Sequence, residues 1–195
     1  MQTLKFGALI DVPWKNGGGV TRNIAKGLYL DQSAWTLSRA DVSQDGPFSD
    51  FAGMVRILTV VSGGTMTLDT PTSSIEARTW EPIRFDGGLK VYARLVNGPL
   101  TDLNLMFDPH SCEGEVLTRR GPLVGDLTRP DHGLLVLHVL SGAPAIDGVA
   151  VATGDTVFVT TPNVALTLTE DAALLEIRLT YLDQSKAIRL CIAER

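Results

Sequence analysis

The chain has 195 residues, of which 44% are hydrophobic and 20% charged, so it has enough apolar material for a packed core and too much for a disordered chain. Its formal net charge of −5 excludes the basic surface that nucleic-acid binding requires, and no apolar run approaches the ~20 residues of a membrane-spanning helix. The chain has two cysteines, Cys112 and Cys191, and its first residues lack the features of a secretory signal. We therefore expect a cytoplasmic protein with neither a nucleic-acid nor a membrane partner.

Short runs of Val, Leu and Thr, separated by 19 glycines, 10 prolines and other turn residues, predict repeated short strands and little helix. The expected strands are Trp35–Val42, Arg56–Val61, Thr65–Asp69, Lys90–Val96, Leu103–Phe107, Leu134–Leu140, Thr156–Val159, Val164–Thr169 and Leu174–Thr180. This density of strands is typical of sandwiches and barrels.

A glycine-rich segment, Lys15-Asn-Gly-Gly-Gly19, precedes the first of these strands. A phosphate-binding loop places its lysine after the last glycine and follows it with Ser or Thr, whereas here Lys15 comes first and Val20 follows. Two interpretations remain. The segment is either a flexible β-turn or a loop that brings Trp14, Lys15 and Asn16 to a pocket mouth, where they supply an apolar wall, a cation and an amide.

The next candidates are the aromatic turn Gly46-Pro-Phe-Ser-Asp-Phe51 and Arg56. Phe48 and Phe51 are more typical of core packing, although Phe48 is also a candidate for the pocket. Arg56 shares a strand face with Leu58 and Val60, so its guanidinium must reach out of the strand end or find an anion inside. Possible anions are a carboxylate ligand or one of three internal partners, Asp45, Asp86 and Asp102.

The segment Asp102-Leu-Asn-Leu-Met-Phe107 alternates between apolar and polar residues. In an extended strand Leu103, Leu105 and Phe107 share one face, which must pack, while Asp102 and Asn104 share the other. That second face either meets water, which the sequence alone favours, or lines the interior of a barrel.

The second half of the chain offers few polar groups on faces that look interior. Val136, His138, Val157, Val159, Leu166, Leu168, Leu174 and Ile177 are expected to form a filled core, and Glu176 with Arg178 an exposed ion pair. The only other histidines are His110 and His132, so we expect no histidine-based metal site and no cofactor. A packed, hydrogen-bonded His138 is expected rather than a lone metal ligand. No nucleophile and base pair is evident.

The two halves have the same order of elements, which indicates a weak internal repeat. Leu58-Thr-Val-Val-Ser-Gly63 resembles Leu137-His-Val-Leu-Ser-Gly142, in that each is an apolar strand followed by a glycine that permits a tight turn. Residues 108–132 are rich in Gly, Pro and charge. The expected organisation is therefore a first barrel at 1–108 with the candidate pocket, a connector at 109–133, and a second, filled barrel with a C-terminal tail at 134–195.

The pattern of residues 137–159 resembles the core of a cupin, a small jelly-roll barrel. A more specific resemblance covers nearly the whole chain. It rests on Pro13-Trp-Lys-Asn-Gly-Gly-Gly-Val-Thr-Arg22, Trp35-x-x-Ser38-x-Ala40, Gly46-Pro-Phe-Ser-x-Phe51, Gly53-Met-x-Arg56 and Asp102-Leu-Asn-Leu-Met106, which are similar to the signature of the HutD family, also called Ves. The resemblance implies an all-β bicupin of two tandem barrels, linked to histidine utilisation. Asn23 and Thr36 depart from the family pattern, which has an acidic and a basic residue there, and so alter the expected pocket charge.

From the residues and the resemblance together, the ligand-binding candidates are Trp14, Lys15, Asn16, Phe48, Arg56, Asp102 and Asn104. The favoured function is a metal-independent, non-catalytic binding protein, a sensor or regulatory factor, for a small anionic or amide-bearing metabolite of the urocanate or formiminoglutamate class. The alternatives are a metal-free cupin enzyme, such as an isomerase or hydrolase, and an interaction protein with a vestigial pocket. A homodimer is compatible with each of them.

Overall fold

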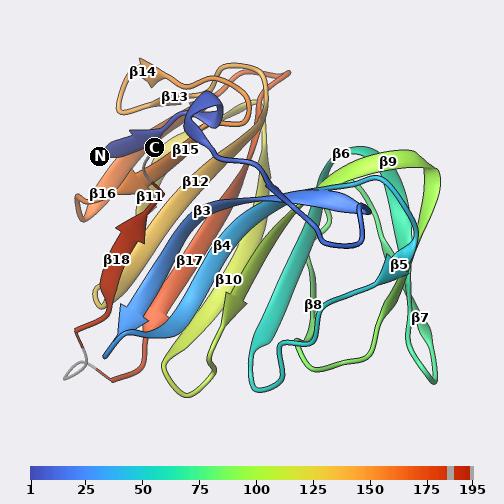
Figure 1. Ribbon diagram of the computed structural model, residues 1–195. Coiled ribbons are helices and arrows are strands. Elements are labelled where there is room, and N and C mark those ends of the chain that lie inside the picture. The colour runs from blue at the N-terminus through green and yellow to red at the C-terminus, as the bar shows by residue number, and fades with distance from the viewer. Residues whose placement is uncertain (184–186, 194–195) are drawn as a thin grey trace. The chain divides into compact units, whose positions relative to one another are not determined.

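The computed structural model describes residues 1–183 and 187–193 and consists almost entirely of β-strands (Figure 1). The helix in these residues is one 3₁₀ turn, η1 (Phe6–Ala8), so the expected scarcity of helix is confirmed. No helix within the same ranges has the length and apolar character needed to cross a membrane. The chain divides into two compact units: Leu9–Ser111 with Ile188–Ala193, here called the cavity unit, and Met1–Ala8 with Cys112–Ala187, here called the filled unit.

The cavity unit is built on one antiparallel sheet of nine strands. They are β2 (Val12–Pro13), β3 (Gly19–Tyr29), β4 (Gln32–Val42), β5 (Gly46–Pro47), β6 (Val55–Asp69), β7 (Ser74–Ala77), β8 (Ile83–Asp86), β9 (Tyr92–Phe107) and β18 (Arg189–Ile192). The main path runs β18-β3-β4-β9-β6-β7, with β2 on β3, β5 on β9 and β8 on β6. The C-terminal β18, red in Figure 1, therefore pairs with β3 near the start of the chain.

The strand register decides which side chains of the cavity unit share a face, because residues directly opposite one another in an antiparallel pair point the same way. Asn104 of β9 lies opposite Ser38 of β4 on one side and Leu58 of β6 on the other. The polar face of β9 is thus continuous with the face of β6 that carries Arg56. On the opposite face Leu103, Leu105 and Phe107 are fully buried, which confirms that the leucine face packs.

β6 and β9 are longer than the sequence predicts. Arg56–Val61 and Thr65–Asp69 belong to one strand, and Lys90–Val96 and Leu103–Phe107 lie largely within another. The glycines that suggested a turn instead allow a very close approach of these two paired strands. Gly63 has a φ of +88°, and a Cβ there would lie 2.5 Å from the carbonyl oxygen of Pro99. Register shifts on both sides of Ser62 and Gly63 absorb the local bend.

The filled unit contains two sheets, ordered β1-β15-β12-β17-β10 and β11-β16-β13-β14. The strands are β1 (Gln2–Leu4), β10 (Cys112–Arg120), β11 (Leu123–Thr128), β12 (Gly133–Ser141), β13 (Ala145–Ile146), β14 (Val149–Ala150), β15 (Thr156–Val159), β16 (Asn163–Leu168) and β17 (Ala173–Tyr181). Two antiparallel sheets around an apolar interior are what a jelly-roll requires.

The interior of this unit is packed with aliphatic side chains: Leu135, Leu137, Val139, Ile146, Val151, Val157, Val159, Val164, Leu166, Leu168, Ala172 and Leu174. A filled core was expected, but the residues that β12 contributes to it are Leu135, Leu137 and Val139, which alternate along the strand with the expected Val136 and His138. Val136 and His138 are buried outside this cluster. His138 is fully buried and its Nδ1 lies 2.9 Å from Thr156 Oγ1, which confirms a packed, hydrogen-bonded histidine.

The sequence predicts an exposed ion pair of Glu176 and Arg178, and the predicted exposure is wrong. The pair forms, with Arg178 Nη1 donating to Glu176 Oε1 at 2.9 Å, but the side chain of Glu176 is only 1% exposed. A second arginine explains how the carboxylate is tolerated there: Arg119 Nε donates to Glu176 Oε2 at 2.7 Å. A buried carboxylate that bonds two guanidiniums has its charge compensated at both oxygens.

The expected division at 1–108, 109–133 and 134–195 also differs from the structure. The segment taken as a connector, 109–133, contains β10 and β11 of the filled unit, and β10 pairs with β17 over its whole length. The N-terminal β1 pairs with β15, so it belongs to the filled unit rather than to a first barrel. Charge and glycine suggested a linker because both strands are amphipathic and border turns.

Candidate functional site

The cavity unit encloses a cavity of about 660 Å³, within the range of small-molecule sites. It opens between the polar face of β3, β4 and β9, the start of β6, and the segments before β3 and after β5. Its lining residues are Pro13, Trp14, Lys15, Asn16, Thr21, Asn23, Thr36, Ser38, Ala40, Pro47, Phe48, Ser49, Phe51, Arg56, Asp102, Asn104 and Met106.

All seven residues that the sequence marked as candidates lie on this cavity: Trp14, Lys15, Asn16, Phe48, Arg56, Asp102 and Asn104. The sequence missed the wall that β3 and β4 contribute. The alternation of Trp35-x-x-Ser38-x-Ala40 held a signal for it, because Thr36, Ser38 and Ala40 point to one face of a strand. That face is continuous with the polar face of β9 on the same side of the sheet, because Ala40 is paired with Asp102 in the register.

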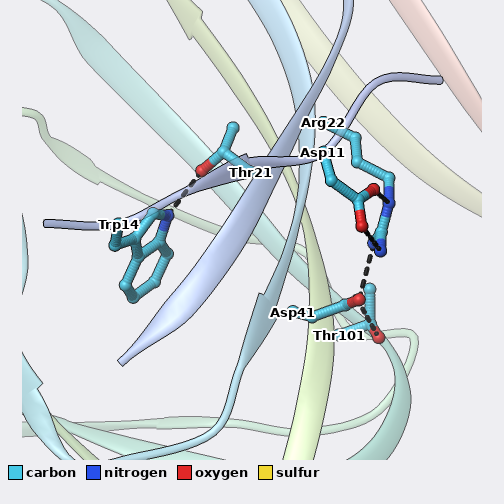
Figure 2. Close-up of polar contacts among 6 residues, drawn as sticks. All are labelled: Asp11, Trp14, Thr21, Arg22, Asp41 and Thr101. Atoms are coloured by element: carbon cyan, nitrogen blue, oxygen red, sulfur yellow. Dashed lines mark hydrogen bonds and ion pairs between the residues drawn. The ribbon is translucent and has the colours of Figure 1, made fainter. Parts of the chain in front are cut away.

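The glycine-rich segment is a tight turn that brings Trp14, Lys15 and Asn16 to the cavity, as the second interpretation predicts, while its flexibility stays a prediction. Gly17 N donates to the carbonyl oxygen of Trp14, and Asn16 Oδ1 accepts a hydrogen bond from Gly18 N at 3.0 Å. The indole of Trp14 donates from Nε1 to Thr21 Oγ1 at 2.7 Å (Figure 2). A Cβ at Gly19 would lie 3.0 Å from the Trp14 ring and 2.4 Å from the carbonyl oxygen of Asp41. A glycine there lets the indole lie against β3.

Arg56 places a positive charge in the cavity, with a side chain that is nearly buried. The residue is 8% exposed, and its Nε donates to Asn104 Oδ1 at 2.8 Å. Its guanidinium carbon lies 4.3 Å from the centroid of the Phe48 ring and 5.7 Å from that of Phe85, distances typical of cation–π contacts. Burial lowers the pKa of Arg56 to about 10, although Asp102 opposes that shift. The guanidinium therefore stays charged at neutral pH.

Asp102 is the partner of Arg56 through Asn104. Asn104 Nδ2 donates to Asp102 Oδ1 at 2.7 Å, so the amide bridges the carboxylate and the guanidinium. Burial raises the pKa of Asp102 to about 6, and the nearby Arg56 charge and the Asn104 hydrogen bond offset only part of this rise. The other two aspartates proposed for Arg56 are used elsewhere. Asp45 accepts from Leu95 N, and Asp86 accepts from Gly88 N.

The two departures from the family pattern, Asn23 and Thr36, both lie on the cavity wall. A neutral amide and a hydroxyl stand where the pattern has an acidic and a basic residue. In the described residues Thr36 Oγ1 is buried without a hydrogen-bond partner. Ser38, which lies opposite Asn23 in the register and two residues after Thr36 on β4, is 7% exposed and adds another hydroxyl. The charges of the described lining residues are therefore those of Lys15, Arg56 and Asp102.

Within the described residues, no three or more His, Cys, Asp and Glu side chains gather as a group that could hold a metal ion. The lining of the cavity contains one carboxylate, that of Asp102, and neither histidine nor cysteine. Such a donor set suits hydrogen bonding to an organic ligand better than coordination of a transition metal.

These features define a class of protein: an all-β, cupin-like chain with a polar cavity on one of its sheets. A bacterial pirin from Escherichia coli shares this fold at 9% identity, with a TM-score of 0.66 over 90% of this chain and 97% of its own. The chain belongs to the HutD family, whose model matches residues 8–176.

Two solved structures and two curated sequences show the same relationship. A conserved protein of unknown function from Pseudomonas aeruginosa PAO1 is 29% identical, with a TM-score of 0.82 over 92% of this chain and 98% of its own. HutD from Pseudomonas fluorescens SBW25, solved in a formate condition, is 26% identical, with a TM-score of 0.82 over 93% of this chain and 99% of its own.

One curated relative is an uncharacterised 21.2 kDa protein from the hutC 3′ region of Pseudomonas putida, 40% identical over 101 residues. That match spans 50% of this chain and 53% of the relative. Protein Ves of Escherichia fergusonii is 33% identical, and its match spans 53% of this chain and 56% of protein Ves. The chain thus spans about half the length of these curated relatives.

Proposed function

We propose that this chain is a cytoplasmic, metal-independent binding protein of histidine utilisation, a non-catalytic sensor or regulatory factor whose cavity takes a small anionic metabolite. The family and the hutC-region relative support the pathway. One observation carries the binding role: a nearly buried guanidinium faces a cavity with hydrogen-bonding capacity to spare. In the described residues Arg56 uses Nε on Asn104, and neither of its terminal nitrogens donates a hydrogen bond.

Those two terminal nitrogens favour a carboxylate as the anion. Nη1 and Nη2 lie in the plane of the guanidinium, and together they match the two oxygens of one carboxylate. Phe48 lies against the guanidinium and reduces its contact with water, which strengthens a charged hydrogen bond made there. The two terminal nitrogens are open to the cavity rather than sealed from solvent, so a carboxylate would replace water at them.

The remaining polar groups suit the rest of such a metabolite. The hydroxyls of Thr36 and Ser38 and the amide of Asn23 can bond an amide, an imidazole edge or a second oxygen function. Trp14 and Phe51 supply apolar walls, and Lys15 adds a second positive charge. These features support the urocanate or formiminoglutamate class of ligand.

Thermal melting tests the proposal, with urocanate, formiminoglutamate, glutamate, histidine and formate as the compounds. A ligand at ~100 times its Kd stabilises by roughly 2.7 kcal/mol. Since 1 kcal/mol moves the midpoint of a chain of this size by about 2–4 °C, we expect a rise of about 5–10 °C with at least one of them.

Two substitutions test the assignment of the site. Arg56→Ala removes the fork and Lys15→Ala removes the second cation, so each should reduce the shift, and Arg56→Ala should abolish it. Arg94→Ala is the matched control, because Arg94 pairs with Asp69 away from the cavity. A shift that survives Arg56→Ala, or no shift with any of the five compounds, contradicts the proposal.

A second candidate function rests on Asp102. A carboxyl with a pKa near 6, facing a cavity beside a cation, can accept or donate a proton at neutral pH. A metal-free isomerase or hydrolase would use such a group. Incubating the protein with the same metabolites and following them by NMR separates the two functions. Turnover that Asp102→Asn abolishes indicates the enzyme, and binding without turnover indicates the sensor.

A further inference from the structure

The motif that leads into β3 ends at Arg22, a residue that does not line the cavity. Successive residues of a strand point to opposite faces, and Thr21 holds the Trp14 indole on the cavity side. Figure 2 accordingly shows the indole on one side of β3 and the guanidinium of Arg22 on the other. The proposed ligand site therefore gives no reason for an arginine at this position.

The guanidinium of Arg22 joins two carboxylates from different segments. On one side it bonds Asp11, the residue before β2, with Nε to Oδ1 at 2.6 Å and Nη2 to Oδ2 at 3.3 Å. On the other side Nη1 bonds Asp41 Oδ2 on β4 at 2.5 Å. Asp41 is held in turn by Thr101 of β9, whose hydroxyl donates to Oδ1 at 2.8 Å. The connection thus runs from the segment before β2 to the middle of the sheet.

The charges of this network favour its connected form. Arg39 lies directly opposite Arg22 in the register, and two like charges at opposing positions repel each other. Asp11 and Asp41 offset that repulsion. Burial raises the pKa of Asp41, but hydrogen bonds from Arg22 and Thr101 outweigh it and hold this pKa below its ordinary value. Hydrogen bonds to Asp11 and Asp41 raise the pKa of Arg22. Arg22 and Asp41 are therefore both charged at neutral pH.

The segment tied down by Asp11 is the one that forms the cavity rim. β2 makes only two register pairs with β3, Val12 with Thr21 and Pro13 with Val20, and a proline has no N–H to donate to the sheet. Trp14, Lys15 and Asn16 follow at once. Backbone hydrogen bonds, such as the one from Trp14 N to the carbonyl oxygen of Gly19, hold part of this rim. Two side-chain bonds add to them from opposite faces of β3: the indole bond to Thr21 on the cavity side, and the ion pair of Asp11 with Arg22 on the other.

We infer that Arg22 is a positioning residue for the cavity, which clamps Asp11 to Asp41 and so holds the rim segment Asp11–Gly19 with Trp14 in place as a wall. It touches no ligand and acts through Trp14. The clamp takes its importance from the proposed function, but its effect on Trp14 can be measured without any ligand.

The test is the rate of solvent exchange of the Trp14 indole N–H, measured by NMR in the ligand-free protein. The chain has three tryptophans, so the indole signals are few, and Trp14→Phe assigns the relevant one. Arg22→Gln and Asp11→Asn should each speed this exchange by about two- to fivefold, the effect of losing one partly exposed ion pair. The indole of Trp80, which donates to the carbonyl oxygen of Val61, should not change.

Three comparisons make the result decisive. The double variant should exchange no faster than Arg22→Gln alone, because that substitution already breaks the link to Asp11. Arg94→Gln is the matched control, since Arg94 Nε bonds Asp69 Oδ2 at the same 2.6 Å on strands β9 and β6, away from the rim. Asp11 is largely exposed, so Asp11→Asn tests the clamp even if Arg22→Gln does not fold.

Unchanged Trp14 exchange in Asp11→Asn, additive effects in the double variant, or an equal effect of Arg94→Gln would overturn the inference. Formate affinity gives the second measurement, and Arg22→Gln should weaken it by a similar factor. If formate binds to neither protein but the indole exchange responds as expected, the proposed ligand fails while the clamp stands.

Discussion

Arg56 and Asp102 show how one buried pair of charges can give a cavity a preference that depends on pH. Asn104 stands between the two groups, so they interact without forming a direct ion pair. Because burial outweighs the attraction of the arginine, the carboxyl has a pKa of about 6, so it is mostly ionised at physiological pH and becomes neutral in mildly acidic solution. The cavity therefore retains an uncompensated positive charge when Asp102 is protonated.

The raised pKa of Asp102 predicts how stability changes with pH. Between about pH 4 and 6 the folded protein holds a proton that the unfolded chain has lost, so this residue makes stability fall as pH rises through that window. In Asp102→Asn this contribution is absent, and the amide can still accept the hydrogen bond from Asn104. The difference in unfolding free energy between the variant and the native chain should grow in favour of the variant by up to about 3 kcal/mol across the window. Urea unfolding at several pH values measures this difference. If the difference does not change with pH, the pKa of Asp102 is not raised in the folded protein.

The same residue predicts the pH dependence of ligand binding. An anion beside Asp102 disfavours the ionised carboxylate, so binding should take up a proton when the pH lies above the pKa of about 6. Formate affinity should then fall as pH rises from 6 to 8, with a limiting slope of about tenfold per pH unit. Calorimetry in two buffers with different ionisation enthalpies measures the proton uptake. Asp102→Asn should bind formate with equal affinity across this range, and a pH dependence that persists in it would assign the proton to another group.

At the scale of the elements, β6 and β9 stay paired and lie very close together through a segment that looks like two turns in the sequence. Both strands continue past residues that normally end a strand, including Gly63 on β6 and Gly98 on β9. Two glycines of the cavity unit allow a test of this close approach of β6 and β9. Gly63 and Gly53 have similar φ values, +88° and +85°, but only Gly63 is crowded by a neighbouring strand.

Replacing each of these glycines with alanine should therefore have unequal effects. Gly53→Ala has open space around the new Cβ, so its cost is the backbone strain of about 1 kcal/mol. Gly63→Ala meets the same strain and also the Pro99 carbonyl oxygen, so β9 has to move. We expect it to be destabilised by at least about 1–3 kcal/mol more than Gly53→Ala, the cost typical of overpacking. Urea unfolding compares the unfolding free energies of the two variants, and equal values would contradict the close approach of β6 and β9 at Gly63.

The sequence predicted the elements better than their extent, for reasons that particular residues make clear. Alternation identified β4, β17 and the buried leucine face of β9, because period-2 patterning follows directly from strand geometry, and a continuous apolar run identified β12. The sequence favoured water for the face of Asp102 and Asn104, which was wrong, because both side chains are buried on the cavity lining and the outcome depends on which strands flank β9. It also could not show that Arg119 reaches Glu176, because the two lie 57 residues apart in the chain.

At the scale of the whole molecule, the two units do not follow the order of the chain. β1 at the start of the chain belongs to the filled unit, and β18 near its end belongs to the cavity unit. A cut between Ser111 and Cys112 would therefore leave each fragment without one strand of its sheet. Local sequence patterns cannot reveal such an exchange, because β1 has three residues and gains its partner only through long-range pairing.

The last prediction follows from this exchange of terminal strands. Deleting residues 1–8 removes β1 from β15, and it also strips two partners from Asp155, which accepts from Lys5 Nζ at 2.8 Å and from Phe6 N at 2.9 Å. The nearly buried carboxylate is then left without them, at a cost of about 1–3 kcal/mol. Hydrogen exchange should become faster in β15 of the filled unit and stay unchanged in β4 of the cavity unit. Adding Asp155→Asn to the truncated chain should recover part of the loss, because a neutral amide is less costly to leave unpaired than a carboxylate. If β15 keeps its protection after the deletion, residues 1–8 do not support the filled unit and the assignment of β1 to it is wrong.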